Sequence, residues 1–538
     1  MPKKFLYGIL ALIVAVMAAF LFLRLGKDRA RGGATNEVAK VTVDSKAGPT
    51  PAVLDLGKKV YEMKCATCHG GDGKGDGEAA FVLYPKPRDF TLGVFKIRST
   101  ESGSPPTDDD LFRTITQGMA GTSMPAWRSL SENERWALVH YVKTFSPRFK
   151  SSPSPQAIAI AGEPAATPDS IAEGKKVYET QKCWNCHGQL GKGDGPAAAT
   201  LQDDRGYPIK PYDFTRGARF KGGSGGADVY RTFITGMDGT PMPSFSTIAE
   251  TQRWQLVHYV KSMSKNGKPA ASEVEQVTRS ISSRYVKEAI PAEDVSASIW
   301  EKATAFEVPL RSLWLKDVSV EKLSVRSLHN DRDLAFLLEW EDAVADQDNI
   351  KVQDFRDAAA VQFSLTDREP FFGMGEKNGL VNIWHWKADW QKDMGHRQDM
   401  ENQYSRLAAD FYPTNERPAS QVIPTAQHDP AYLSGLAAGN AFSQLSRSSP
   451  VEDLNAAGMG TLTAQPPKAQ NVKGRGVWAE GKWRVLMVRP LNSPDAGDAK
   501  FPIGKAVPVA FAIWNGADHD RNGQKSVSVW YPLQLEGK

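Results

Sequence analysis

The chain has 538 residues, of which 41% are hydrophobic and 24% are charged, a composition typical of globular proteins. This length exceeds what one hydrophobic core supports, so three or four domains are expected. The net charge of +4 is small, and no dense basic face or binding motif is present. Nucleic acid is therefore not expected as a partner.

The first predicted element is a transmembrane helix. Residues 5–23 carry no charge, and basic residues flank them on both sides. Such a run is long enough to span a bilayer, and no A-x-A cleavage site follows it. We therefore expect a transmembrane anchor over residues 1–26 and a polar tether over residues 27–51. A cleaved signal peptide is the alternative.

Two CxxCH motifs, "CATCH" at 65–69 and "CWNCH" at 183–187, contain all four cysteines. This motif is the attachment signature of c-type haem, in which two thiols bind the haem and the histidine binds the iron. Zinc, dithiol or iron–sulfur sites would need the same cysteines, and their wider spacing patterns are absent. The predicted haem-attachment cysteines are Cys65, Cys68, Cys183 and Cys186, and the predicted proximal ligands are His69 and His187.

The two motifs belong to an internal duplication. "RTITQGMAGTSMPAW" from residue 113 matches "RTFITGMDGTPMPSF" from residue 231, and "RWALVHYVK" matches "RWQLVHYVK". Each copy resembles a class I cytochrome c domain. We therefore expect two all-α cytochrome c domains over residues 52–148 and 168–264, joined by a linker over 149–167. A capping box at Ser131 and Glu134 marks the start of the last helix in the first copy.

Each copy offers two methionines as the sixth iron ligand. Met124 and Met242 each precede a proline, which stiffens the loop beside the ligand, and each lies shortly before the last helix. They are the predicted axial ligands. Met119 and Met237 are alternatives that can instead pack on the porphyrin, and His140 and His258 are rival ligands on the last helices. The repeated "GKGDG" runs indicate glycine-rich turns.

The remaining chain changes to period-two patterns after a connector over residues 265–289. Strands are predicted at 334–342, 358–365, 481–491, 506–517 and 525–536, with a hairpin turn in "WAEGKW". Residues 395–470 are irregular and indicate an insertion. The pattern predicts an all-β sandwich with irregular insertions over residues 290–538.

Two stretches of this region carry a more specific resemblance. "FFGMGEKNGLVNIWHWKADW" from residue 371 and "AFAIWNGADHDRNGQKSVSVWYPLQL" from residue 510 resemble the haem-binding subunit of the ethylbenzene dehydrogenase family. These are γ subunits of dimethyl-sulfoxide-reductase-type molybdenum enzymes. The resemblance implies a non-covalent b haem with one Met and one Lys ligand, and the matching positions are Met374 and Lys525. A core methionine and a strand-edge lysine are the structural alternatives, and His385 is a rival ligand.

Taken together, the sequence predicts a multidomain protein: an N-terminal transmembrane helix, two all-α cytochrome c domains in tandem and a C-terminal all-β sandwich. The expected function is electron transport in a respiratory chain, through two covalent c haems and one b haem. The chain would dock on the iron–sulfur subunit of a periplasmic, nitrite oxidoreductase-like molybdenum enzyme.

Electrons would then pass to a soluble cytochrome c or a terminal oxidase. The expected location is the cytoplasmic membrane, with a single span and the haem domains on the periplasmic side. No nucleophile constellation indicates catalysis by the chain itself. The alternatives are a di-haem peroxidase, and cytochrome c domains fused to a ligand-binding or sensory sandwich.

Overall fold

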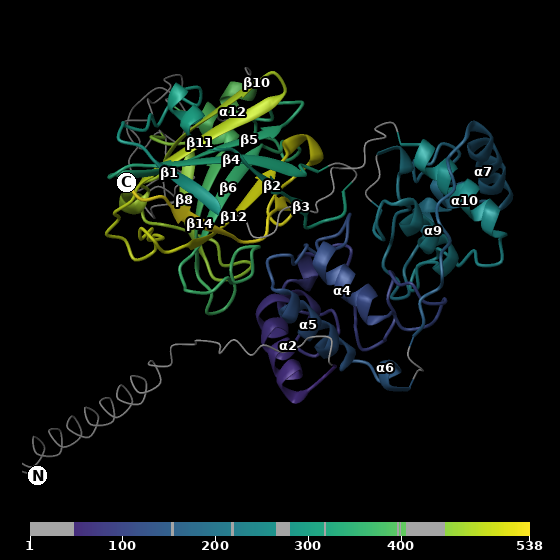
Figure 1. The fold of residues 1–538 in the computed structure, drawn as a ribbon. Helices are drawn as coiled ribbons and strands as arrows, with labels where there is room; N and C mark the ends of the chain where they lie inside the picture. Colours follow the sequence, from purple (N-terminus) through teal and green to yellow (C-terminus); the bar gives the residue numbers. More distant parts are fainter. Residues whose placement is uncertain are drawn as a thin grey trace, which may run out of the picture. The chain divides into compact units, whose positions relative to one another are not determined.

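The computed structural model describes residues 48–151, 155–216, 220–264, 280–316, 319–394, 398, 400–404 and 447–538. Helices dominate the described chain up to residue 262, and strands dominate from residue 281 onwards (Figure 1). In the sequence, the period-two pattern that predicts strands likewise appears after the cytochrome c repeats.

The expected fold class included an N-terminal transmembrane helix, and the structure does not support this part of it. No helix among the described residues is long and apolar enough to cross a membrane. The longest helices, such as the 14-residue α2, are about 21 Å long, whereas the bilayer core is about 30 Å thick. Residues 1–26, on which the prediction rested, lie outside the described ranges.

The first helical domain is built around two crossing helices. Its elements are α2 (Pro51–Lys64), α3 (Ala66–His69), η1 (Ala80–Val82), α4 (Asp108–Gln117), α5 (Glu132–Lys143) and α6 (Arg148–Ser151). The predicted capping box at the start of α5 is confirmed, with Ser131 and Glu134 bonding each other's backbone amides. Helix α2 crosses α5 at Gly57, where a Cβ would lie 2.2 Å from the Ala137 carbonyl oxygen.

The second helical domain repeats this arrangement. Its elements are α7 (Pro168–Thr180), α8 (Trp184–His187), η2 (Ala198–Thr200), η3 (Phe214–Arg216), α9 (Gly226–Thr235) and α10 (Glu250–Ser262). Helix α7 crosses α10 at Gly174, which corresponds to Gly57, and a Cβ there would lie 2.0 Å from the Gln255 carbonyl oxygen. Both domains therefore require the absence of a side chain where their first and last helices meet.

The C-terminal region forms one long sheet that folds over itself. Its main strands are β1 (Ile281–Tyr285), β2 (Phe306–Pro309), β4 (Lys322–His329), β5 (Asp333–Glu341), β6 (Ala358–Ser364), β7 (Val381–Lys387), β8 (Val451–Ala456), β10 (Lys473–Ala479), β11 (Lys482–Pro490), β12 (Val507–Trp514) and β14 (Tyr531–Leu535). The strand order is β10-β11-β5-β4-β1-β14-β12-β6-β7-β8-β9, with β3 (Arg311–Ser312), β9 (Thr463–Ala464) and β13 (Ser526–Val527) as two-residue strands.

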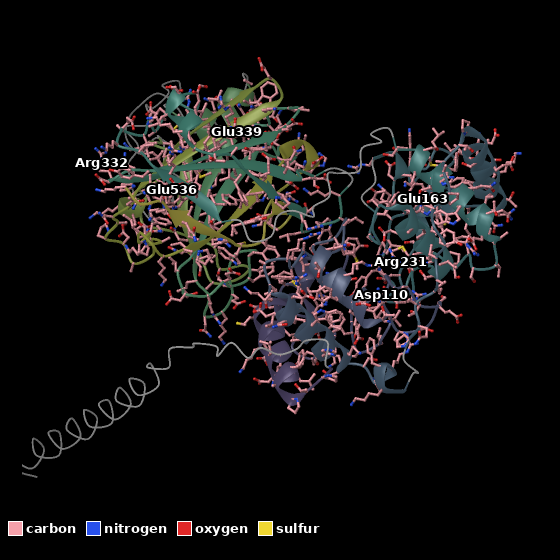
Figure 2. All side chains as sticks on the ribbon, in the orientation of Figure 1. Asp110, Glu163, Arg231, Arg332, Glu339 and Glu536 are labelled. Carbon is pink, nitrogen blue, oxygen red and sulfur yellow. The ribbon has the colours of Figure 1, made fainter. Side chains whose placement is uncertain are left out.

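Alternate residues of each strand face different cores, as a sandwich requires. Phe336 of β5 and Val361 of β6 belong to one large inner core, which also contains Trp384 and Trp483. Their neighbours in sequence point outwards: Leu337 joins a smaller cluster, and Ala360 joins another. On the polar side of the sheet, Glu339 of β5, labelled in Figure 2, pairs with Arg326 and Arg484 of the flanking strands.

The predicted β-rich region is present, and most predicted strands are confirmed within two residues. The hairpin at "WAEGKW" joins β10 to β11, with Glu480 and Gly481 both at positive φ. Strand β13 breaks off before β14, so residues 525–536 are not one strand. Strand β1 lies in the predicted connector and β8 in the predicted insertion, because both are short and lack strict alternation.

Candidate haem sites

The first CxxCH motif forms the junction between α2 and the following loop. Cys65 ends α2 and His69 ends the one-turn helix α3, and the His69 Nδ1 lies 3.0 Å from the Arg88 carbonyl oxygen. This hydrogen bond fixes Nδ1 as the protonated nitrogen and leaves Nε2 as the nitrogen available to a metal. Burial lowers the pKa of His69 to about 4, so the ring is neutral, as an iron ligand must be.

The second motif has the same geometry. His187 ends α8, and its Nδ1 lies 3.2 Å from the Tyr212 carbonyl oxygen, at the position that corresponds to Arg88. Phe90 stacks on His69 at 4.4 Å, and Phe214 stacks on His187 at 4.5 Å. The two copies therefore share not only their sequence pattern but also the hydrogen bond and the stacked aromatic ring that orient each histidine.

The cysteines lie beside apolar clusters of the two domains. Cys65 packs against the cluster of the first domain and Cys183 against that of the second. All four cysteines are partly exposed, and burial raises the pKa of Cys65 and Cys68 to about 12 and that of Cys183 to about 11. The residues present therefore fit a covalently attached haem.

Met124 and Met242, unlike Met119 and Met237, share a cluster with the attachment motif of their own domain, as Met263 also does in the second domain. Met124 packs with Cys65 and Ala66, and Met242 packs with Cys183 and Trp184. Each loop is held in the same way: the amide of Met124 donates to Thr122 Oγ1 at 3.2 Å, and that of Met242 donates to Thr240 Oγ1 at 3.2 Å. Met119 and Met237 donate their amides to the carbonyls of Met124 and Met242 and so support these loops.

His258 lies at the other end of its domain. Its Nδ1 is 2.9 Å from Ser170 Oγ, in the first turn of α7. Ser170 is ten residues before the end of α7, about 15 Å along the helix axis, whereas the CxxCH motif follows that end. His140 occupies the corresponding buried position on α5. The placement of His258 favours methionine as the sixth ligand.

A second kind of haem site lies on the outer face of the sandwich. Small side chains form its floor: Ala358 and Ala360 of β6 pair with Trp514 and Ala512 of β12, and Ala510 follows along the same face. Larger residues form its sides, including Phe371, Ile383, Leu454 and Trp530. Small and aromatic apolar side chains therefore line this face, a chemistry that suits an apolar group.

The structure places Met374 and Lys525 at this face. Met374 is partly buried against the apolar cluster, at a φ of 111° that methionine rarely adopts. Lys525 is 5% exposed, its Nζ lies 4.8 Å from the centre of the Trp514 ring, and no described residue accepts a hydrogen bond from it. Burial lowers its pKa to about 8, which eases the loss of the proton that a Lys ligand must give up.

His385 remains a rival at the same face. It pairs with Ala360 across the sheet and stacks on Trp514 at 4.7 Å. Burial and nearby cations lower its pKa well below the ordinary value, so its ring is neutral. Met374, Lys525 and His385 are all available to a haem here, and the thioether, amine and imidazole would give different spectra.

The attachment loop of the first helical domain packs against this face. Cys68 and Val82 contact the cluster that contains Met374, and Ala79 and Leu83 are buried in it. Thr67 Oγ1 lies 3.4 Å from Glu376 Oε2, two residues after Met374. Lys64 forms an ion pair of 2.6 Å with Glu369, and the Tyr84 amide donates to the Leu313 carbonyl at 3.1 Å. The covalent haem motif and the sandwich face therefore adjoin.

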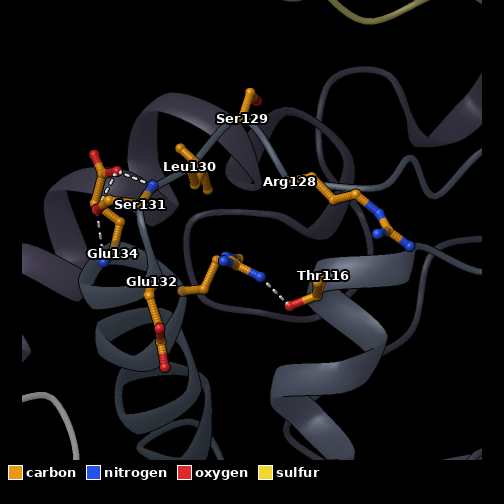
Figure 3. Close-up of a pocket in the computed structure, with 8 residues that line it drawn as sticks. Thr116, Arg128, Ser129, Leu130, Ser131, Glu132 and Glu134 are labelled. Carbon is orange, nitrogen blue, oxygen red and sulfur yellow. Dashed lines mark hydrogen bonds between the residues drawn. The ribbon is translucent and has the colours of Figure 1, made fainter. Parts of the chain in front are cut away.

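A separate surface hollow, shown in Figure 3, lies between α4 and the start of α5. Arg135 donates to Thr116 Oγ1 at 2.6 Å across it, and Ser131 and Glu134 bond each other at its rim. Its polar groups stabilise the ends of the two helices, and Leu130 in its lining also belongs to the cluster that contains Cys65 and Met124.

The sequence matches three families. Residues 297–526 match the ethylbenzene dehydrogenase family, residues 52–142 match subunit III of cbb3-type cytochrome c oxidase, and residues 171–264 match cytochrome c. The cytochrome c domains imply covalently bound haem c, and the ethylbenzene dehydrogenase domain implies haem b. The expectations for both kinds of haem are thereby confirmed.

Three curated proteins resemble part of the chain. The ORF7 haem subunit assigned to a respiratory nitrate reductase of Haloferax mediterranei is 29% identical over 45% of this chain and 70% of its own length. The chlorate reductase γ subunit of Ideonella dechloratans is 24% identical over 44% of this chain and 78% of its own. The dimethylsulfide dehydrogenase γ subunit of Rhodovulum sulfidophilum is 27% identical over 36% of this chain and 52% of its own.

These relatives are haem or γ subunits of larger oxidoreductases, which supports an electron-transfer role. The chain is an electron-transfer subunit in which two cytochrome c domains are fused to a haem-binding domain of the ethylbenzene dehydrogenase family.

Proposed function

We propose that this chain carries electrons between a molybdenum oxidoreductase and a cytochrome c or terminal oxidase, through one b haem and two c haems. Bound haems supply reversible one-electron transfer. The b haem is held by Met374 and Lys525, and the c haems by the two CxxCH motifs with Met124 and Met242 as sixth ligands. The haem domains lie on the periplasmic side.

The contact between the first attachment loop and the sandwich carries this proposal. Cys68, which attaches the first c haem, packs against the cluster that contains Met374. The b haem is therefore the neighbour of the first c haem in the relay and the second c haem follows it, and electrons can flow along this order in either direction. The chain's own residues hold the haems, exclude water from them and keep them adjacent.

The partner is the catalytic part of a nitrite oxidoreductase-like enzyme. The nitrate reductase assignment of the Haloferax mediterranei relative supports this, because nitrate and nitrite are the two sides of one redox couple. A di-haem peroxidase would need one haem with an open or labile sixth position. The equivalent packing of Met124 and Met242 disfavours it.

The test is the haem content of the full chain, matured with its c-haem assembly machinery. Pyridine haemochrome spectra, recorded with and without prior acid–acetone extraction, distinguish covalent from extractable haem. We expect two c haems and one extractable b haem per chain. Two c haems without extractable haem, in folded protein, would contradict the relay.

Substitutions then test the b-haem ligands. Met374→Ala and Lys525→Ala should each abolish extractable haem while both c haems remain. Met459→Ala is the matched control, because Met459 packs against the same cluster without being a predicted ligand. Loss of b haem only from a His385→Ala variant would assign the ligand to His385 instead.

A further inference from the structure

In each cytochrome c domain, a lysine follows an aromatic residue that packs beside the haem-attachment motif. Phe95 shares a cluster with Cys65 and Met124, and Phe220 shares one with Cys183 and Met242. Lys96 and Lys221 are the next residues in the chain. The backbone of each lysine therefore lies next to the apolar cluster that contains the attachment motif of its domain.

The segments that contain Lys96 and Lys221 lie beside each other. A Cβ on Gly222 would lie 3.6 Å from Ile97 Cδ1, so the segments after Lys96 and Lys221 are in contact. Arg205 Nη2 donates to the Pro87 carbonyl at 2.9 Å, and Arg88 Nη1 lies 3.6 Å from Asp204 Oδ2. The segment of the first domain that orients His69 thus packs against the second domain.

Ion pairs hold the same boundary. Arg113 of α4 lies 3.9 Å from Asp228 of α9. Burial lowers the pKa of Arg231 of α9, and the nearby carboxylates Asp228 and Asp110 of α4 partly oppose this. Figure 2 labels Asp110 and Arg231. Arg98, whose side chain is fully buried, donates to the Thr235 carbonyl at 2.6 Å and pairs with Asp238 at 2.8 Å.

Positive charge is in excess at this boundary. Four cations are present, Arg88, Lys96, Arg205 and Lys221, against three nearby carboxylates, Asp89, Asp203 and Asp204. Asp203 Oδ1 is already used by the amides of Arg205 and Tyr207 at 3.0 Å each.

Two arginine nitrogens at this boundary lack acceptors. Arg88 Nη1 and Arg205 Nε are buried without a hydrogen-bond acceptor. Lys96 and Lys221 are half-buried, and burial lowers the pKa of Lys96 to about 8 and also lowers that of Lys221. Buried guanidinium nitrogens without acceptors are costly, so an anion is expected beside them.

The c haems supply such anions. Each haem has an apolar macrocycle, which suits the apolar cluster of its domain. Its two propionate carboxylates are charged, so they are expected at the edge of that cluster. We propose that the propionates of both c haems share one binding site across the domain boundary, formed by Arg88, Lys96, Arg205 and Lys221. This inference deepens the proposed function but rests only on the two c haems.

The shared site has two consequences for the haems. With both haems bound, these residues would hold their propionates at one boundary, which would shorten the path from the first c haem to the second. The cations also stabilise the reduced state of each haem, because reduction adds one negative charge. A unit charge about 10 Å from the iron, at an effective dielectric constant of about 20, changes the reduction equilibrium about tenfold.

The test is an optical redox titration of the full, haem-loaded chain. Lys96→Met and Lys221→Met should each lower the potential of one c haem, a different one in each variant, by an amount equivalent to about tenfold. Lys58→Met is the matched control, because Lys58 is an exposed lysine of the first domain. The infrared redox-difference bands of the propionate carboxylates should move in the two variants and not in the control.

The Lys96→Arg variant keeps the positive charge, so it distinguishes an effect of charge from an effect on folding. Haem content and potential should both survive this change, even if Lys96→Met fails to load haem. The proposal is overturned if both methionine variants load two c haems with unchanged potentials, if the control shows the same fall, or if Lys96→Arg lowers the potential as far as Lys96→Met. Haem content is measured first. Absence of the b haem would contradict the relay, whereas unchanged c-haem potentials in the lysine variants would contradict the shared site.

Discussion

Each proximal histidine is oriented by a carbonyl oxygen rather than by a carboxylate. His69 and His187 donate to the carbonyls of Arg88 and Tyr212. A carbonyl partner leaves the imidazole less basic than a carboxylate would, and a thioether ligand, proposed for Met124 and Met242, would further favour the ferrous state. Both features suit haems that accept electrons from a fairly oxidising donor.

At this scale, Met124→Leu should remove the methionine-to-iron charge-transfer absorption of one haem and lower its potential, because the thioether that favours ferrous iron is lost. Met119→Leu serves as the control and should retain both. Visible spectra combined with a redox titration provide the measurement. If Met119→Leu instead loses the band, the sixth ligand is assigned wrongly.

A buried carboxyl in the sandwich gives a pH prediction. Burial and the neighbouring Asp498 raise the pKa of Asp453 to about 8, whereas in the unfolded chain it is near 3.9. Between these pH values the folded state holds the extra proton, so the free energy of unfolding should fall as pH rises from about 4 to about 8. Asp453→Asn mimics the protonated acid and should flatten this dependence.

Urea titrations of the haem-loaded chain between pH 5 and pH 8 measure the effect. Asn382 and Gln465 donate to Asp453 Oδ1 at 2.6 and 3.0 Å, and the substitution keeps this acceptor. Asp367→Asn, at an exposed carboxyl, is the control and should leave the slope unchanged. An unaltered slope in Asp453→Asn would show that Asp453 is ionised in the folded protein.

Residue roles were predictable where the pattern itself carries the chemistry. CxxCH, repeated with a matching methionine, identified the c-haem candidates without any structure. Lys96 and Lys221 were missed, although "FK" recurs in both copies, because an isolated lysine in a loop is usually solvated. Only the packing of one domain on the other shows that these half-buried lysines lie close to each other and to Arg88.

At the scale of elements, the crossing of the first and last helices determines each cytochrome c domain. Gly57→Ala or Gly174→Ala should destabilise its domain by about 2 kcal/mol, because the added Cβ meets a backbone carbonyl that has no room to move. Thermal or urea unfolding monitored at the haem absorption measures this. Gly71→Ala is the control, since a Cβ at Gly71 meets nothing within 4 Å.

The β10–β11 hairpin offers a stabilising change. Glu480 occupies a φ of 52° at the turn, where Asn is favoured over Glu. Glu480→Asn should therefore raise the free energy of unfolding of the sandwich by about 0.5 kcal/mol. Urea unfolding followed by tryptophan fluorescence is suitable. A decrease would indicate a role for the Glu480 side chain in the folded state.

Strands with clear alternation or strong apolar runs were predictable, and short ones were not. Strands β5, β6, β11 and β12 matched their predicted ranges because each is flanked by turn residues and is rich in branched or aromatic side chains. Strand β1 pairs in parallel with β4 and β14, and parallel pairing between distant segments leaves no local signal. The sequence therefore predicted several central strands but not the complete sheet.

At the scale of the whole molecule, the ion pair between Lys64 and Glu369 joins the first cytochrome c domain to the sandwich. Lys64→Glu or Glu369→Lys should loosen this contact by less than about 1 kcal/mol, because Glu369 is substantially exposed. Combining both reversals should restore it.

Hydrogen exchange at the Tyr84 amide reports on this contact, because that amide donates to Leu313 across the boundary. Exchange should accelerate in each single variant and recover in the double variant. The Phe90 amide, which donates to Gly73 within the first domain at 2.7 Å, is the internal control. No recovery in the double variant would mean that the two charges act independently.

The boundary between the cytochrome c domains joins equivalent positions of the repeat. Asp110 and Arg113 on α4 meet Asp228 and Arg231 on α9, and the residue after Lys96 meets the residue after Lys221. Contacts between equivalent surfaces are those of a two-fold homodimer. Fusion of two such copies on one polypeptide makes their association intramolecular, so the pairing no longer weakens on dilution, and each copy is free to diverge towards a different electron donor or acceptor.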